Sequence, residues 1–469
     1  MKLTLEQIAR WCGGELRCAN PAHPATGYSI DSRTLEPGDL FFAIHGERFD
    51  GHEFIAAAQE RGAVAAVVAR SWIAGLGAAP DYTHIVVEDT LVALQHLASA
   101  VRRHWGKRVV GITGSAGKTT TKEAVATVLG VGYSVLKSRG NLNNNYGLPL
   151  QLLRLEPEHD VAVIEMGMNH AGEITALARI AAPNWGVVTN VGRAHIENFP
   201  DGIAGIARAK YELIQSLPPD GIAFLNCDDP YVSQFGRDFH GRVIHFGRGP
   251  CANLRVEQIE NLGPDGLRLA VHADGQRASL HLHLLGEHNV SNILAALAVG
   301  LAAEIPLDMA ARALESLQPE DKRGEVLTWH GATIINDCYN SNPEALKAMI
   351  ATLAGMPAGR RIVVAGEMLE LGTESPALHA ACGKAAAEAG VNLVIGVRGA
   401  ANSMVDAARA AGVEAQYLET PEEAGEWLRA NLREGDAVLL KASRGVRLER
   451  AVHLLLANGE NSTWAGAAH

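Results

Sequence analysis

The chain lacks several features that would assign its class at once. No run of lysine or arginine gives it a basic face, and its formal net charge is −11, so nucleic-acid binding is not indicated. No apolar run approaches the roughly 20 residues of a membrane span, and we find no signal peptide. The six cysteines are scattered without Cys-x-x-Cys spacing, so we expect free thiols rather than a zinc site or a disulfide framework. These absences predict a cytoplasmic protein.

Composition and length are those of a soluble chain with several cores. The 469 residues are 47% hydrophobic and 20% charged, and a chain of this length suggests about three domains. We expect an α/β protein with a small N-terminal α/β unit at 1–84 and a central P-loop unit with a mostly parallel sheet at 85–314. A C-terminal Rossmann-like unit should follow at 315–457, with a frayed tail at 458–469.

One stretch, from Arg108 to Thr121, organises the rest of the prediction. A short apolar run is followed by a loop of small residues and then by a helical pattern. The loop and the first helical turn are Thr113, Gly114, Ser115, Ala116, Gly117, Lys118, Thr119 and Thr120. Backbone N–H groups and a helix N-terminus would bind phosphate here, with Lys118 on the outer phosphates and the Thr119 hydroxyl on Mg²⁺. Ile112 occupies the place of the motif's first glycine, so this is a variant P-loop, and the alternative is a plain strand-to-helix turn.

Polar residues follow the other strands that we expect in the central sheet. The strands are 109–112, 161–164, 186–189 and 222–225, and an antiparallel extension should lie between about 226 and 285. Glu165 follows one strand, and His195 lies in the loop after another. Because ligands bind at the carboxyl ends of parallel strands, both should lie near the phosphate loop. Asn143 and Asn144 belong to an asparagine-rich loop that either contacts a polar ligand or makes turns.

Several further residues allow two interpretations. Asp31, Ser32 and Arg33 form either a binding loop or an ordinary turn. Asn289 and Asn292 share a helix face and either grip a purine edge or cap the helix. Lys210, on a helix with few other charges, would ordinarily be a surface lysine. In the third unit, strands are expected at 333–336, 362–365, 393–397 and 437–441, with polar loops between them.

Taken in order, these motifs resemble the Mur ligases of peptidoglycan synthesis from about residue 3 to residue 457. The resemblance rests on motifs spread over all three units: Asp31 to Arg33, Thr113 to Thr119, Glu165 to Gly167, Ala194-His195, Ala209-Lys210, His288 to Asn292 and Lys441 to Arg444. Within the family, the segments Asn141 to Asn144, Asp337 to Asn342 and Gly366 to Gly372 are most similar to members that add D-alanyl-D-alanine to UDP-N-acetylmuramoyl-tripeptide.

The resemblance implies amide ligation driven by ATP through an acyl phosphate. Lys118, His195 and Lys210 would be catalytic. Thr119 and Glu165 would hold one Mg²⁺, and His195 with a carbamylated Lys210 a second, because an ammonium group offers no acceptor to a cation. The implied nucleotide contacts outside the P-loop are Asn289, Asn292, Arg323, Asp337 and Tyr339 or Asn340. The implied substrate contacts are Asp31, Ser32, Arg33 and Gly46 for the UDP-sugar, Asn143 and Asn144 for the peptide, and Lys441, Ser443 and Arg444 for D-alanyl-D-alanine.

Two competing functions stay open on the sequence. One is a related Mur or folylpolyglutamate-type ligase that adds another residue, of which the folylpolyglutamate type would lack the first unit with Asp31 to Arg33. A P-loop kinase or regulatory NTPase would need neither the second nucleotide-contacting unit nor Lys210. We expect a monomer with small-molecule substrates.

Overall fold

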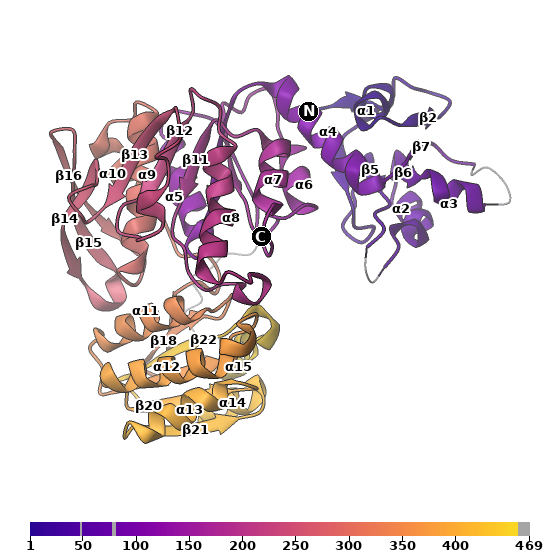
Figure 1. The fold of residues 1–469 in the computed structure, drawn as a ribbon. Coiled ribbons are helices and arrows are strands. Elements are labelled where there is room, and N and C mark those ends of the chain that lie inside the picture. The colour runs from indigo at the N-terminus through magenta and orange to yellow at the C-terminus, as the bar shows by residue number, and fades with distance from the viewer. Residues whose placement is uncertain (47–48, 77–80, 458–469) are drawn as a thin grey trace.

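The computed structural model describes residues 1–46, 49–76 and 81–457, which form three α/β units (Figure 1). The N-terminal unit, in indigo, and the C-terminal unit, in orange and yellow, lie against different sides of the central unit. The predicted frayed tail at 458–469 lies outside the described residues. Among the described residues, no helix has the length and hydropathy that crossing a membrane requires.

The N-terminal unit is built on a five-stranded sheet of order β2-β7-β6-β5-β4. Its elements are β1 (Leu3–Thr4), α1 (Leu5–Cys12), β2 (Glu15–Arg17), β3 (Pro24–Ala25), β4 (Gly27–Ser29), β5 (Asp39–Phe42), α2 (Ile55–Glu60), β6 (Ala65–Ala69), α3 (Arg70–Gly75) and β7 (His84–Val87). Thr4 and Gln7 form a capping box that starts α1. The sheet extends to Val87, beyond the boundary that we expected at residue 84.

The central unit is a nine-stranded sheet of order β16-β15-β14-β13-β12-β11-β8-β10-β9. Its elements are α4 (Thr90–Trp105), β8 (Arg108–Thr113), α5 (Lys118–Leu129), β9 (Val135–Lys137), α6 (Gly147–Leu152), β10 (Val161–Glu165), α7 (Glu173–Ala181), β11 (Trp185–Val188), α8 (Ile203–Gln215), β12 (Ile222–Asn226), β13 (Arg242–Gly247), β14 (Leu254–Asn261), β15 (Leu267–Ala273), β16 (Gln276–Leu282), α9 (His288–Ala302) and α10 (Leu307–Leu314).

The position of β8 within this sheet sets the site. β8 pairs in parallel with β10 on one side and β11 on the other, so their carboxyl ends meet at one edge. Helix α5 packs against α9 and buries Val125 and Val128, as the helical spacing predicted. The predicted antiparallel extension is confirmed for β14, β15 and β16, whereas β13 continues the parallel part.

The C-terminal unit has a six-stranded sheet of order β17-β18-β22-β19-β20-β21, in which only β17 is antiparallel. Its elements are β17 (Glu325–Trp329), β18 (Ala332–Asp337), α11 (Pro343–Ala354), β19 (Arg360–Gly366), α12 (Ser375–Glu388), β20 (Leu393–Val397), α13 (Ala401–Ala410), β21 (Glu414–Leu418), α14 (Pro421–Asn431), β22 (Asp436–Lys441) and α15 (Glu449–Leu456). The four predicted strands are confirmed. The two edge strands, β17 and β21, were missed because neither has a continuous apolar run.

The prediction of free thiols is wrong for one cysteine pair. Cys227 and Cys251 form a disulfide with a Cα–Cα distance of 6.1 Å. The two residues follow β12 and β13, and these strands are parallel neighbours, so their carboxyl ends bring the cysteines together. Spacing in the sequence could not show this pairing, because it depends on the order of strands in the sheet. Cys12, Cys18, Cys338 and Cys382 are free.

Candidate active site

A cavity of about 400 Å³ lies at the carboxyl edge of β8 and β10 and is lined on the other side by the C-terminal unit. It gathers most of the residues that the sequence singled out. These are Gly114, Ser115, Ala116, Gly117, Lys118, Thr119, Thr120, Asn143, Asn144, Glu165, His195, Lys210, Asn289, Asn292, Arg323, Asp337, Tyr339, Asn340, Lys441 and Arg444. Segments more than 300 residues apart in the sequence therefore meet at one site.

The P-loop contacts the segment after β11 and helix α9. Asn190 accepts a hydrogen bond from the Ala116 N–H at 2.9 Å through Oδ1. At Gly117, with φ at 79°, a Cβ atom would lie 2.2 Å from Oδ1 of Asn292, so only glycine fits. Lys118 donates from Nζ to the Gly114 carbonyl at 2.9 Å, which arches its side chain over the loop. The interpretation as a plain strand-to-helix turn does not account for this arrangement.

The two asparagines of α9 tie that helix to the P-loop helix. Asn292 is buried, accepts from the Thr121 hydroxyl at 3.2 Å and donates to Asn289 Oδ1 at 2.9 Å. Asn289 donates in turn to the Leu285 carbonyl at 2.8 Å. Neither residue is the N-cap, which is Glu287, so the capping interpretation is wrong.

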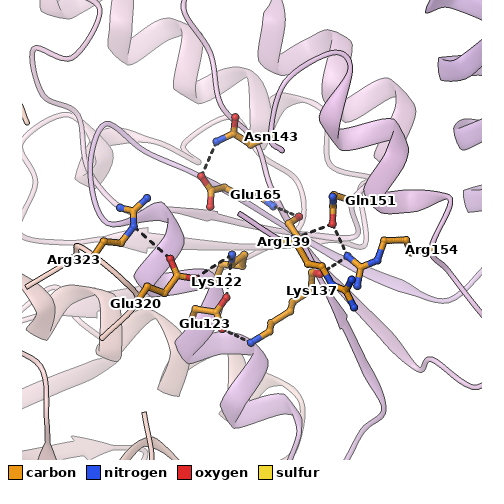
Figure 2. A network of polar contacts seen from close by, with 11 residues as sticks. Lys122, Glu123, Lys137, Arg139, Asn143, Gln151, Arg154, Glu165, Glu320 and Arg323 are labelled. Carbon is orange, nitrogen blue, oxygen red and sulfur yellow. Dashed lines mark hydrogen bonds and ion pairs between the residues drawn. The ribbon is translucent and has the colours of Figure 1, made fainter. Parts of the chain in front are cut away.

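Glu165 presents an unpaired carboxylate oxygen at the cavity. The side chain is 2% exposed, and its Oε1 accepts from Asn143 Nδ2 at 2.7 Å (Figure 2). Its Oε2 is buried and has no hydrogen-bond partner among the described residues. A buried unpaired carboxylate oxygen is costly unless a further donor or a cation satisfies it. Among the described residues, no group of three or more His, Cys, Asp or Glu side chains is placed to hold a metal ion.

Lys210 is not a surface lysine. It lies on α8, is 3% exposed and lines the same cavity as Lys118. Burial, and then the positive charge of Lys118, hold the pKa of the Lys210 ammonium well below its ordinary value. The amine of Lys210 therefore loses its proton at lower pH than that of a solvated lysine.

His195 meets the C-terminal unit directly. Its Nδ1 contacts Oε2 of Glu370, and this contact lowers the pKa of the Glu370 carboxyl although burial opposes the shift. Both residues adopt left-handed backbone conformations, with φ of 63° at His195 and 64° at Glu370. Such conformations are costly outside glycine and concentrate at functional sites.

Other cations of the cavity are held by the C-terminal unit. Lys441 forms an ion pair with Asp337 at 2.6 Å and donates to the Asn340 carbonyl at 2.9 Å. The Arg323 guanidinium stacks over the Tyr339 ring, with Cζ 3.8 Å from the ring centroid.

A few residues singled out in the sequence lie elsewhere. Thr113 is buried and donates to the Met166 carbonyl, and Ser443 is buried and donates to the Ser341 carbonyl, so neither lines the cavity. Asp31, Ser32, Arg33 and Gly46 belong to the N-terminal unit, where Arg33 pairs with Asp31 at 2.8 Å. Residues 47 and 48, which follow Gly46, lie outside the described residues.

Some residues of the site were missed from the sequence. Asn169, Glu173, His288 and Ser341 line the cavity, and Glu370 pairs with His195. Glu370 lies within the quoted segment Gly366 to Gly372, whose position after β19 was the available signal. His288 and Ser341 likewise lie within the quoted segments His288 to Asn292 and Asp337 to Asn342 but were given no role. Asn169 and Glu173 have no distinctive spacing in the sequence.

A P-loop on a parallel sheet, facing a cation-rich second α/β unit across one cavity, defines an enzyme that binds ATP between two units. The chain belongs to the Mur ligase family. Residues 24–102 match the model described as Mur ligase family, catalytic domain; 112–300 match Mur ligase middle domain; and 322–444 match Mur ligase, glutamate ligase domain.

Relatives of known identity cover almost the whole chain. The chain is 36% identical to UDP-N-acetylmuramoyl-tripeptide–D-alanyl-D-alanine ligase of Bacillus subtilis, over 97% of this chain and 99% of the relative. It is 34% identical to the ligase of that name from Escherichia coli, over 98% and 99%. Among solved structures, MurF of Thermotoga maritima in complex with ADP is similar, with a TM-score of 0.80, 30% identity and coverage of 92% and 96%.

Proposed function

We propose that this protein is an ATP-dependent ligase that adds D-alanyl-D-alanine to UDP-N-acetylmuramoyl-tripeptide in the synthesis of peptidoglycan precursors. The observation that carries the proposal is the single cavity in which Lys118 and Glu165 of the P-loop unit face Arg323 and Lys441 of the C-terminal unit. Relatives at 34% to 38% identity over nearly the whole chain carry this activity in their names.

The chemistry explains why the cavity is rich in cations. A peptide carboxylate attacks the γ-phosphorus of ATP and gives an acyl phosphate and ADP. The dipeptide amine then attacks the acyl carbon, and phosphate leaves as the amide forms. Repulsion between two unit negative charges is about 4 kcal/mol at ~4 Å and moderate effective dielectric, so the approach of the carboxylate needs compensation. Lys118 and Arg323 supply fixed positive charge where the phosphates would lie.

Mg²⁺ fits the residues that are present. The unpaired Oε2 of Glu165 is an oxygen ligand of the kind Mg²⁺ prefers, and Thr119, which carries a hydroxyl, lines the same cavity. Thr119 and Glu165 would hold one ion, and His195 with a modified Lys210 a second. The ions would neutralise charge on the phosphates and the reacting carboxylate.

Carbamylation would make Lys210 a suitable ligand. The amine lone pair adds to the carbon of CO₂, the amine loses a proton, and the product is an anionic carbamate with oxygen acceptors. The burial of Lys210 supports this step, because it favours the neutral amine over the ammonium.

We assign the remaining substrate contacts by unit. Asp31, Ser32, Arg33 and Gly46 of the N-terminal unit, expected to span 1–84, would bind the UDP-sugar. Asn143 and Asn144 of the central unit (85–314) would contact the peptide. Asn289, Asn292, Asp337, Tyr339 and Asn340 would contact the nucleotide, while Lys441, Ser443 and Arg444 of the third unit (315–457) would orient D-alanyl-D-alanine. We further propose a cytoplasmic monomer.

A coupled assay of ADP release tests the proposal. ADP should form only when ATP, UDP-N-acetylmuramoyl-tripeptide and D-alanyl-D-alanine are all present. Release with glutamate and a folate in their place would favour the folylpolyglutamate-type alternative, and release with ATP alone would favour an NTPase.

A further inference from the structure

Lys122 is a fully buried charge on the P-loop helix, one turn after Lys118. Its side chain is 1% exposed, and Nζ lies 3.0 Å from Oε1 of Glu123 and 3.7 Å from Oε1 of Glu320. Glu320 in turn lies 3.4 Å from Nε of Arg323. Figure 2 shows these residues as one chain of polar contacts, which we call the linker cluster: Lys122, Glu123, Glu320 and Arg323.

Packing alone does not explain a lysine at this position. Nζ has close carboxylate neighbours but no aligned hydrogen bond among the described residues. Removing an ammonium from water costs several kcal/mol, and a hydrophobic residue of similar volume is often as stable in such a site. Burial alone therefore gives no reason for a charge at this position, and the contacts of Lys122 indicate where it acts.

Those contacts join two units that the nucleotide cavity also joins. Lys122 belongs to α5, whose first turn is part of the P-loop. Glu320 belongs to the segment between α10 and β17, which connects the central and C-terminal units. Three residues later, Arg323 stacks on Tyr339 and lines the cavity. The Arg323 N–H also donates to the Glu320 carbonyl at 3.0 Å, so a backbone hydrogen bond joins the two residues in addition to their side-chain contact.

Lys122 is the cation that lies between the two carboxylates of the cluster. Burial and the neighbouring Glu123 carboxylate raise the pKa of Glu320, while Lys122 opposes this shift. Glu123 has a second partner in Lys137, an exposed lysine on β9. Without Lys122, the partly buried Glu123 and Glu320 carboxylates would face each other without the cation between them, and like-charge repulsion would favour movement of Glu320 away from α5.

We propose that Lys122 is a positioning residue for ATP: its charge fixes Glu320 against the P-loop helix, and Glu320 holds Arg323 at the nucleotide cavity. The inference rests on the proposed contact of Arg323 with the nucleotide. The segment before β17 is then attached to the P-loop helix through Glu320 and does not act as a free linker between the two units.

Steady-state kinetics of the full-length protein test the inference. Lys122→Met and the milder Glu320→Gln should each raise KM for ATP at least about fivefold, the scale of a coupling between sites, and leave KM for D-alanyl-D-alanine within about twofold. In an Arg323→Ala background, Lys122→Met should change KM for ATP less than about twofold, because the two residues act in series. Lys137→Met is the matched control, and it should leave all constants within about twofold because the Lys137 side chain is exposed and Glu123 keeps its contact with Lys122.

A further variant separates positioning from folding. Lys122→Met/Glu320→Leu removes both charges, so it should unfold at a higher temperature than Lys122→Met while keeping the raised KM for ATP. If KM returns to the native value together with Tm, or if Lys122→Met raises KM equally in the Arg323→Ala background, the inference is overturned. If Arg323→Ala alone has a native KM for ATP, the proposed Arg323 contact and this inference both fail, and the ligase activity stands.

Discussion

Lys118→Met is the substitution for which the structure makes the sharpest prediction. The ammonium lies within hydrogen-bond distance of the Gly114 carbonyl, 2.9 Å away, above the loop that would bind the transferring phosphoryl group. The attraction between a lysine charge and a phosphoryl charge ~4 Å away is about 4 kcal/mol at an effective dielectric of ~20. Loss of that attraction in the transition state would slow the reaction by at most about 10³-fold. Loss of one electrostatic stabiliser commonly costs 10² to 10³, so we expect kcat to fall by about that factor.

The same substitution should not destabilise the protein. Burial, and the nearby Arg323 charge, lower the pKa of Lys118, although Glu165 partly compensates. A lysine whose pKa is depressed by folding lowers stability throughout the range in which it stays charged, and the cost vanishes only as pH rises through its unfolded pKa. At neutral pH the unfolded chain carries this charge, so the cost is present and removing the charge should leave Tm unchanged or higher.

The assay is phosphate release with both substrates, read beside thermal unfolding without ligands. Lys107→Met is a matched control, because Lys107 precedes β8 at the opposite edge of the sheet and pairs with Asp160 near the surface. It should keep native kcat. Retention of more than about a third of activity by Lys118→Met, or a fall in Tm parallel to the loss of activity, would refute the assignment.

Three further predictions concern the cavity and its support. Glu165→Gln and His195→Ala should each raise the Mg²⁺ concentration for half-maximal rate about tenfold or more, and native Mg²⁺ dependence in both would contradict the proposed metal sites. Lys210→Ala should lose most activity and regain part of it with a short carboxylic acid in the assay, whereas native activity would exclude the carbamate. His379 is fully buried, and burial lowers its pKa, so stability should be lost as pH falls below about 6.5. His379→Gln should flatten the dependence of Tm on pH in that range, and an unchanged slope would contradict this.

The parts of the fold that the sequence predicted well are those with local signals. The run before Gly114 and the helical spacing after Lys118 specify β8 and α5 without reference to the rest of the chain. Polar residues at strand ends, such as Glu165, could be placed because parallel strands share one functional edge.

The parts that were missed depend on assembly of the whole molecule. The pairing of Cys227 with Cys251 follows from the order of β12 and β13, which the sequence does not state. Glu370 reaches His195 only across the junction of two units. The burial of Lys210 and Lys122 could not be read from their helices, because the faces that cover them come from distant segments. Lysine is ordinarily exposed, so the sequence favoured the wrong environment.

The most direct test of the account follows an oxygen atom. UDP-N-acetylmuramoyl-tripeptide labelled with ¹⁸O in its reacting carboxylate is turned over with ATP and D-alanyl-D-alanine, and the released phosphate is analysed by mass spectrometry. An acyl phosphate intermediate transfers a carboxylate oxygen to phosphorus, so the account predicts labelled phosphate in step with the pentapeptide product. Unlabelled phosphate, or labelled substrate recovered without the new amide, would contradict it.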